Sequence, residues 1–242
     1  MVDIRILYED NHLLVVVKPP DMPVQADISG ALDLLTYLKQ DLKVRYNKPG
    51  NVFLGLVHRL DRPVGGTMVF AKTSKAASRL SEQIRNREMG KTYLCVVQGV
   101  PEPLKGRLTD YLLKDRNSNI VKVVNPDTRG AKKAVLEYEV LSQAQGLSLV
   151  EINLITGRSH QIRVQMSHNH TPLVGDNKYG NKLRVGAVPS TNKDNQIDNR
   201  GRGIGLSLWS HKVEIKHPTT KERMLFTSSP PDSFPWNLFK QV

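Results

Sequence analysis

Apolar residues recur at every second position through much of the second half of this chain, and this alternation constrains the fold more than any other feature. Within residues 147–154, Val150 and Ile152 alternate with Glu151 and Asn153. A period of two places successive side chains on opposite faces of a strand, so such stretches predict β-strands. Together with short apolar runs closed by turn residues, they predict strands at residues 13–17, 52–57, 67–71, 93–97, 135–141, 147–154, 206–208, 213–215 and 224–226.

Three segments have the apolar spacing of a helix. Leucines recur every three or four positions over residues 32–42, behind Asp27 and Ser29, either of which can cap a helix. Residues 74–89 carry an apolar stripe with a basic opposite face, and a third helix is expected after Gly157. Long strand-rich stretches with few helices predict an α+β fold, with a mixed, largely antiparallel central sheet and flanking helices.

The balance of charged residues restricts the choice of partners. The 242 residues include 35 Lys and Arg against 23 Asp and Glu, which gives a formal net charge of +12 and a pI near 9.8. This excess favours a polyanionic partner, nucleic acid before an acidic membrane, although a generic soluble surface stays open. The length predicts one domain over residues 1–242, built from two lobes, with a flexible loop at 181–203 and a monomeric state as the expectation.

Cysteine content and hydropathy exclude several classes of protein. Cys95 is the only cysteine, which excludes a disulfide scaffold and a cysteine-rich zinc site and fits a reducing compartment. No apolar run approaches the ~20 residues of a membrane span. The acidic N-terminal residues do not resemble a signal peptide. We therefore expect a cytoplasmic protein without a membrane partner.

The sequence matches phosphate-binding and metal-binding motifs only in part. The sequence Gly90-Lys91-Thr92 ends like a phosphate-binding loop, but Arg85 stands where that motif requires its first glycine. Three histidines between residues 160 and 170 have no cysteine or acidic cluster that would complete a metal site. We predict no metal and no nucleotide cofactor.

The most unusual segment of the chain surrounds Asp61. This carboxylate lies between Arg59 and Arg62 and is followed by a proline and two glycines, between two predicted strands. Nearby guanidinium charge favours the ionised carboxylate, and glycines let the backbone come close to a ligand. On these residues alone, a catalytic carboxylate and a salt-bridged surface turn both stay open.

The residues His58-Arg59-Leu60-Asp61, followed by a turn with glycines, resemble the signature of the RluA-type pseudouridine synthases. Further segments agree with this family in the same order along the chain, so the resemblance covers about residues 5 to 227. These segments are Val16-Val17-Lys18-Pro19, Lys91-Thr92-Tyr93, Thr156 to Arg163, Pro172 to Gly180, Leu208 and His217-Pro218-Thr219.

Two features depart from the family pattern. Members commonly have Thr-Ser-Gly where this chain has Val64-Gly65-Gly66, so the hydroxyl groups are lost while the turn-forming character is kept. Many members also carry a small RNA-binding module in front of the catalytic region, and we expect this chain to lack it.

The resemblance implies isomerisation of uridine to pseudouridine in RNA, without a cofactor, in a basic catalytic cleft. It makes Asp61 the catalytic carboxylate, as nucleophile or base, and implies that Arg163 pairs with it. Tyr93 is expected to stack on the uracil ring and to help remove the C5 proton, and Leu208 to form the apolar wall of the base pocket. The alternatives are a phosphate contact or a structural ion pair for Arg163, an ordinary strand aromatic for Tyr93 and a core leucine for Leu208.

A structured RNA must extrude its uridine before an aspartate can reach the ribose. Arg59 is the expected residue to fill the vacated space, and His58 beside it is expected to contact substrate. Phosphate contacts are expected from Arg158 and from the basic face of the helix over residues 74–89, although a solvated helix face is an equal alternative. The basic residues of that face are Lys75, Arg79, Arg85 and Arg87.

Two other functions compete with this interpretation. A non-catalytic RNA-binding protein with the same fold would bind RNA with the same salt dependence but leave uridine unchanged. A nucleoside glycosidase would release free uracil, and it has no need of a +12 surface. The RNA partner is expected to be ribosomal RNA or transfer RNA, with ribosomal RNA favoured by analogy.

Overall fold

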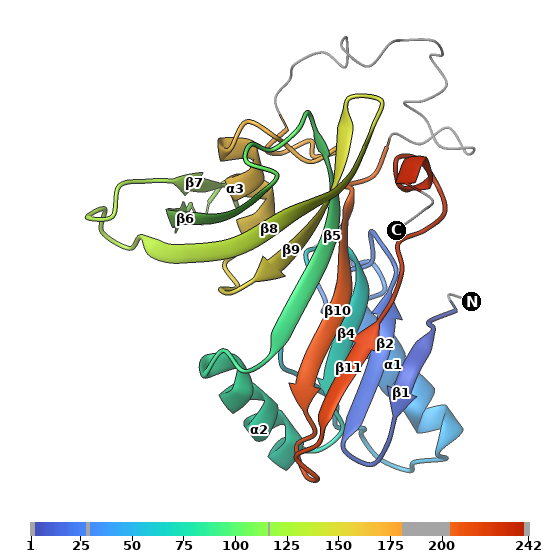
Figure 1. The fold of residues 1–242 in the computed structure, drawn as a ribbon. Helices are drawn as coiled ribbons and strands as arrows, with labels where there is room; N and C mark the ends of the chain where they lie inside the picture. The colour runs from blue at the N-terminus through green and yellow to red at the C-terminus, as the bar shows by residue number, and fades with distance from the viewer. Residues whose placement is uncertain (1–2, 28–29, 116, 181–203, 240–242) are drawn as a thin grey trace. The chain divides into compact units, whose positions relative to one another are not determined.

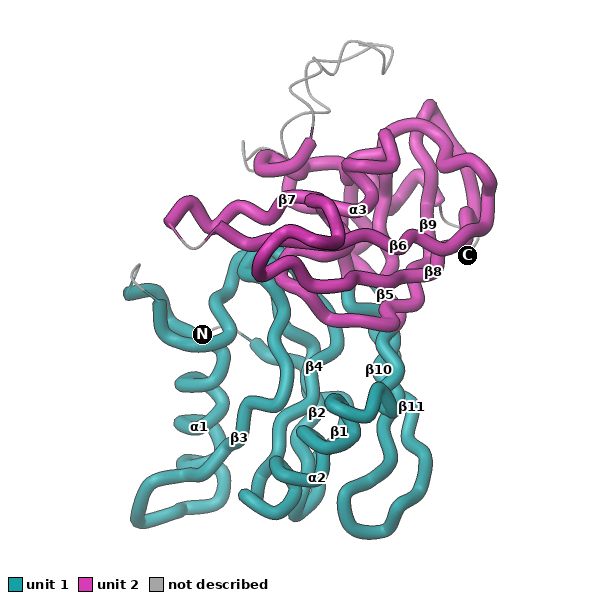
Figure 2. The backbone as a smooth tube through the Cα atoms, turned by 90° about the vertical axis from the view of Figure 1, so that its left-hand side faces the viewer, with its two compact units in different colours: residues 1–91, 210–229 teal, residues 92–209, 230–242 magenta. Residues whose placement is uncertain are grey.

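The computed structural model describes residues 3–27, 30–115, 117–180 and 204–239. The loop expected at 181–203 lies outside these residues. The chain folds into two compact units, of which unit 1 comprises residues 1–91 and 210–229, and unit 2 comprises residues 92–209 and 230–242 (Figure 2).

Unit 1 combines strands with two helices (Figure 1). Its elements are β1 (Ile6–Glu9), β2 (Leu13–Lys18), α1 (Leu34–Arg45), β3 (Gly55–Leu56), β4 (Gly65–Ala71), α2 (Ser74–Arg85), most of β10 (Leu208–Lys216) and β11 (Arg223–Thr227). The strand order is β1-β2-β4-β10, with β11 on β10 and β3 on β4. Strands β2 and β4 pair antiparallel from Leu13 opposite Ala71 to Lys18 opposite Gly66.

Unit 2 is built on long antiparallel strands and one helix. Its elements are β5 (Gly90–Gln98, from Thr92 onward), β6 (Lys105–Lys114), β7 (Val121–Val123), β8 (Lys132–Ala144), β9 (Leu147–Leu154), α3 (Gln161–His168) and the 3-10 helix η2 (Trp236–Phe239). The strand order is β5-β9-β8-β6-β7, and each neighbouring pair is antiparallel. The expected α+β fold with a largely antiparallel sheet is therefore confirmed.

The core of unit 1 explains why its strands read as continuous apolar runs. On one face, α2 packs Ala76 and Leu80 against Leu13, Val69 and other strand residues. The alternate residues of β2 and β4 are also fully buried, so both faces of these strands exclude water. Helix α1, which lies behind β1 and β2 in the view of Figure 1, buries its own leucine stripe. Strands buried on both faces have no polar alternation.

The N-terminus of α1 differs from the sequence prediction. The cap is Asp33, whose Oδ1 accepts a hydrogen bond from the Thr36 amide at 3.0 Å, so the expected caps Asp27 and Ser29 are wrong. Leu32 precedes the helix and is exposed. For α2, the Thr73 side chain is the cap and accepts the Ala76 amide, but the helix ends at Arg85 rather than at residue 89.

Unit 2 positions α3 against the β6–β7 hairpin. Val164 of α3 packs with Leu112, Val121 and Ala134, and every residue from Gln161 to Met166 is buried. Strand β6 was not predicted because only Leu112 among its residues is buried, so its apolar alternation is weak. Strands β1 and β7 were also not predicted, and the two strands expected at 206–208 and 213–215 are the single strand β10. No helix in the described ranges is long and apolar enough to cross a membrane.

Candidate active site

Asp61 lies in a tight turn that enters strand β4. The Asp61 carbonyl accepts the Val64 amide at 3.0 Å, which closes a four-residue turn across Pro63. Leu60 and Val64 are buried on either side of the turn, whereas Asp61 is half-buried. The two apolar neighbours therefore anchor the turn and leave its carboxylate at the surface of unit 1.

Gly66 allows the segment after this turn to join the sheet. Its φ of +117° favours glycine, and a Cβ built there would lie 2.3 Å from the Ser210 carbonyl oxygen of β10. No side chain can occupy that space without moving β10. The altered Val64-Gly65-Gly66 sequence thus keeps the glycine that the close approach of strands β4 and β10 requires.

Lys18 supports the same turn from within the core. Its side chain is fully buried at the end of β2, and its Nζ donates hydrogen bonds to the carbonyl oxygens of Pro19, Arg62 and Val64 at 2.8, 2.9 and 2.8 Å. An ammonium group has three donors, so the three carbonyls match its capacity. Two of these acceptors belong to the Asp61 turn, and the turn is therefore held by its backbone rather than by hydroxyl groups.

The burial of Lys18 has an electrostatic consequence. Desolvation lowers the pKa of Lys18 from 10.5 to about 7, because the charged form is penalised away from water. The carboxylates of Asp21 and Asp61 act in the opposite direction, and Arg62 adds to the lowering. The carboxylate of Asp61 therefore favours the charged form of Lys18.

His58 fixes the other end of the turn. Its Nε2 accepts a hydrogen bond from the Val69 amide of β4 at 3.0 Å, so the ring satisfies a backbone donor of that strand. Burial lowers the pKa of His58 to about 4, and the charge of Lys91 contributes. The imidazole is consequently neutral at physiological pH and anchors the turn. This contact gives a structural role to a residue that was predicted to contact substrate, and that prediction stays open.

In unit 2, Arg163 is held by a buried carboxylate. Its Nε and Nη2 donate to Asp176 Oδ2 and Oδ1, each at 2.8 Å, and its Cζ lies 5.1 Å from the centre of the Tyr179 ring. Arg163 was predicted to pair with Asp61. Because these two residues belong to different units, that pair stays a prediction.

The loop before α3 is fixed by side chains within it. Gln161 Oε1 accepts from Thr156 Oγ1 and from the Arg158 amide, while its Nε2 donates to the Val135 carbonyl of β8 at 3.1 Å. Arg158, predicted to contact phosphate, directs its Nε to the Lys133 carbonyl at 3.0 Å. The loop thus presents Arg158 from a rigid support on β8.

The two residues predicted to enclose the base are both buried in unit 2. Tyr93 lies on β5 opposite Ile152 of β9 and is 7% exposed, and Leu208 begins β10 at 5% exposed. Their placement on strands fits rigid walls of a pocket. The same burial fits core residues, so their predicted roles stay predictions.

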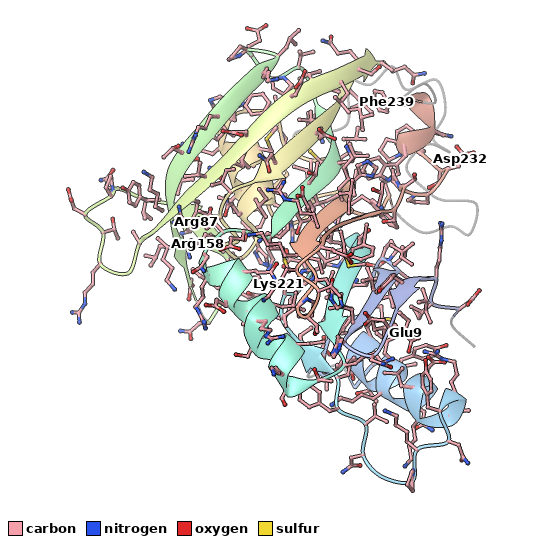
Figure 3. All side chains as sticks on the ribbon, turned by 60° about the horizontal axis from the view of Figure 1, so that its bottom comes forward. Glu9, Arg87, Arg158, Lys221, Asp232 and Phe239 are labelled. Atoms are coloured by element: carbon pink, nitrogen blue, oxygen red, sulfur yellow. The ribbon has the colours of Figure 1, made fainter. Side chains whose placement is uncertain are left out.

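The basic residues of α2 lie far from the Asp61 turn. Strand β4 starts beside the turn and ends just before α2, and its seven residues span about 20 Å at the usual rise per residue. Arg79 donates to the Pro218 carbonyl at 2.7 Å and so supports the turn after β10. The other basic residues of this face are exposed, namely Lys75, Arg85 and Arg87, the last beyond the end of the helix (Figure 3).

The structure therefore distributes the predicted site over both units. Those in unit 1 are Asp61, His58, Arg59 and the basic residues of α2, and those in unit 2 are Tyr93, Arg158, Arg163 and Leu208. Within unit 1, Arg59 lies two residues before the turn that carries Asp61 and is exposed. Among the residues that the structure describes, no group of His, Cys, Asp or Glu could hold a metal ion.

Three supporting residues were not assigned a role from the sequence. Lys18 ends an apolar strand, and a lysine in that place signals a buried cation that needs acceptors. Asp176 and Tyr179 fall in a segment that carries the family resemblance, but no sequence pattern pairs them with Arg163. Such contacts depend on tertiary structure.

Comparisons with known proteins agree with the resemblance. A family model described as RNA pseudouridylate synthase matches residues 12–168. The ribosomal large subunit pseudouridine synthase D of Pseudomonas aeruginosa is 34% identical over 98% of this chain and 71% of its own length. The synthase C of Buchnera aphidicola subsp. Baizongia pistaciae is 34% identical over 92% of this chain and 66% of its own.

These relatives are longer than this chain, which spans about two thirds of their length. Among solved structures, human RNA pseudouridylate synthase domain containing 4 superposes with a TM-score of 0.74 at 27% identity, over 94% of this chain and 88% of that one. The fold and the family resemblance predicted from the sequence are both confirmed.

Proposed function

Because the chain belongs to the RNA pseudouridylate synthase family, we propose that it converts uridine to pseudouridine in RNA, with Asp61 as the catalytic carboxylate. The observation that carries this assignment is the support of the Asp61 turn. A buried lysine and a neutral histidine hold that turn, and the segment after it joins the sheet through Gly66, where a Cβ would meet the Ser210 carbonyl oxygen. An ordinary surface turn does not need such buried support.

The reaction is balanced within the substrate. The N1–C1′ bond breaks, the uracil turns, and a C5–C1′ bond forms, while the C5 proton leaves and N1 gains one. Asp61 either attacks C1′, in which case the Asp61–C1′ bond breaks as C5 of the retained base bonds to C1′, or removes a ribose proton and returns it when the retained base recombines. No electrons are transferred to or from the substrate, so the residues of the chain suffice for each step.

We propose the roles implied by the family resemblance for four further residues. Tyr93 stacks on the uracil and assists loss of the C5 proton, Leu208 forms the apolar wall, and Arg163 orients the Asp61 carboxylate. Arg59 occupies the space left by the extruded base. The family membership supports these roles, and Tyr93 and Leu208 lie on strands β5 and β10.

We further propose that the substrate is the RNA of the large ribosomal subunit. Relatives matched over most of this chain are named for that subunit, and the +12 charge suits an extended RNA surface. The exposed basic residues of α2, about 20 Å from the turn, would then hold phosphates remote from the target uridine. A monomer acting in the cytoplasm is the matching state, and the free buried thiol of Cys95 fits a reducing compartment.

The experiment uses ribosomal RNA carrying tritium at uridine C5. Wild-type protein should release tritium and form pseudouridine, whereas Asp61→Asn should bind the RNA and release none. Asp127→Asn, a matched exposed change on the loop after β7, should retain turnover. Free uracil would instead indicate a glycosidase, and salt-dependent binding without tritium release would indicate a non-catalytic RNA-binding protein.

A further inference from the structure

Arg163, which the proposed function pairs with Asp61, is bound by a second carboxylate, that of Asp176. Asp176 receives Arg163 in a two-point contact, each hydrogen bond 2.8 Å long, and the two side chains are 1% and 8% exposed. Parallel N–H to oxygen bonds of this kind fix both the plane and the direction of a guanidinium group. Arg163 therefore has one defined orientation within unit 2.

The Asp176 carboxylate is held by several hydrogen bonds from its neighbours. Its Oδ1 also accepts the backbone amides of Lys178 and Tyr179, at 2.9 and 3.0 Å. Four N–H groups therefore donate to this carboxylate, three to Oδ1 and one to Oδ2. Burial opposes ionisation, but the hydrogen bonds and charge of Arg163 and the two amides outweigh it and hold the pKa of Asp176 below its usual value. Asp176 is thus a fixed anion.

Tyr179 supports the same arginine through its ring. The Cζ atom of Arg163 lies 5.1 Å from the ring centre, within the range of a cation–π contact. The ring itself is held at its hydroxyl, which accepts the Val121 amide of β7 at 2.9 Å and lies 2.5 Å from Nδ1 of His160, the N-cap residue of α3. The ring is tied to two separate elements and cannot turn freely.

We propose that Asp176 and Tyr179 are positioning residues that hold Arg163 in its working orientation before RNA binds. This inference rests on the proposed function, because it assigns a purpose to the orientation of Arg163. An arginine ordered only on binding would lose side-chain entropy in each turnover. One that is ordered in advance orients the catalytic carboxylate without that loss. Loss of either support lowers kcat and leaves RNA binding nearly intact.

A double-mutant cycle separates positioning from a general effect on folding. Asp176→Asn keeps the size of the side chain and the acceptor for the two amides, but it faces Arg163 with an N–H group. We expect kcat to fall roughly 10–100-fold, with KM changed by less than about threefold. In an Arg163→Met background, Asp176→Asn should cause no further loss of kcat beyond about twofold. An equal loss in both backgrounds, or an unchanged kcat in the wild-type background, would overturn the proposal.

A second measurement does not depend on catalysis. The Nε–H proton of Arg163 is buried in a hydrogen bond to Asp176, so its exchange with water in ¹⁵N-labelled wild-type protein should be slow. Asp176→Asn should accelerate it, and the exposed control Asp127→Asn should not. Tyr179→Phe keeps the ring and loses only the hydroxyl, so it should fold and shift exchange and kcat in the same direction to a smaller extent.

The two readouts distinguish the possible failures. Wild-type protein with slow Nε–H exchange but no pseudouridine formation would refute the proposed function. It would also refute a catalytic purpose for the contacts of Asp176 and Tyr179 with Arg163. Active wild-type protein whose Nε–H exchanges as fast as that of an exposed arginine would overturn the positioning role alone.

Discussion

The buried ammonium of Lys18 makes a prediction about how stability depends on pH. Its pKa falls from 10.5 to about 7 in the folded protein, so between these values the unfolded chain binds one more proton than the folded one. Stability therefore rises with pH in this window, by up to about 1.4 kcal/mol per pH unit. Below pH 7 both states are protonated, and the cost of burying the charge is largest.

Lys18→Met removes this titration and the three hydrogen bonds of Nζ. Each buried carbonyl left without a partner costs about 1–3 kcal/mol, offset at low pH by removal of the buried charge. Between pH 7 and 8.5 the wild type should gain about 1.5 kcal/mol of unfolding free energy that Lys18→Met does not gain. Lys18→Met should therefore be least favourable, relative to the wild type, at the higher pH.

The assay is urea unfolding of both proteins at pH 7 and pH 8.5, followed by circular dichroism. Lys43→Met, an exposed lysine of α1, supplies the matched control, and its difference from the wild type should be the same at both pH values. If the difference between wild type and Lys18→Met is also constant, Lys18 does not titrate in a desolvated site and the reasoning is refuted.

Three further predictions concern the turn and the RNA surface. His58→Ala should reduce the unfolding free energy by about 1–3 kcal/mol, measured by urea unfolding, because the Val69 amide loses its acceptor; a neutral effect would contradict the anchoring role. Gly66→Ala should prevent normal folding or cost at least about 3 kcal/mol, because its Cβ meets the Ser210 carbonyl, whereas Gly50→Ala, in open space, should be well tolerated in thermal melts. Glutamine at the exposed basic residues should weaken RNA binding and reduce the slope of log affinity against log salt by about 1 per residue, and an unchanged slope would assign them to a solvated helix face. These residues are Lys75, Arg85 and Arg87.

Strands buried on both faces, or with clean alternation, could be predicted from the sequence. Residues 147–154 are strand β9 with the predicted bounds, because their alternation reflects a half-exposed position between β5 and β8. Strand β6 escaped detection because Gly106 and Asp110 interrupt the apolar alternation of its more buried face, so tertiary pairing with β8 rather than its own pattern makes it a strand. The start of α1 was misplaced because several residues before it can cap a helix, and the structure uses Asp33, which accepts the Thr36 amide.

Some features of the candidate site could likewise be predicted from the sequence, and others could not. Asp61 could be predicted because its neighbours are unusual in type and spacing. The support of its turn by Lys18 could not be predicted. The acceptors are backbone carbonyls 44 and 46 residues away, and a backbone carbonyl is present whatever the side chain is. The pairing of Arg163 with Asp176 was missed for a related reason, because an arginine can reach several carboxylates and only the fold selects one.

The central claim is tested most directly by single-turnover conversion of C5-tritiated ribosomal RNA by wild-type protein and Asp61→Asn. Both proteins should bind the RNA with similar affinity and the same salt dependence. The account predicts tritium release and pseudouridine with the wild type, and neither with Asp61→Asn. Pseudouridine formation by Asp61→Asn at the wild-type rate would contradict it.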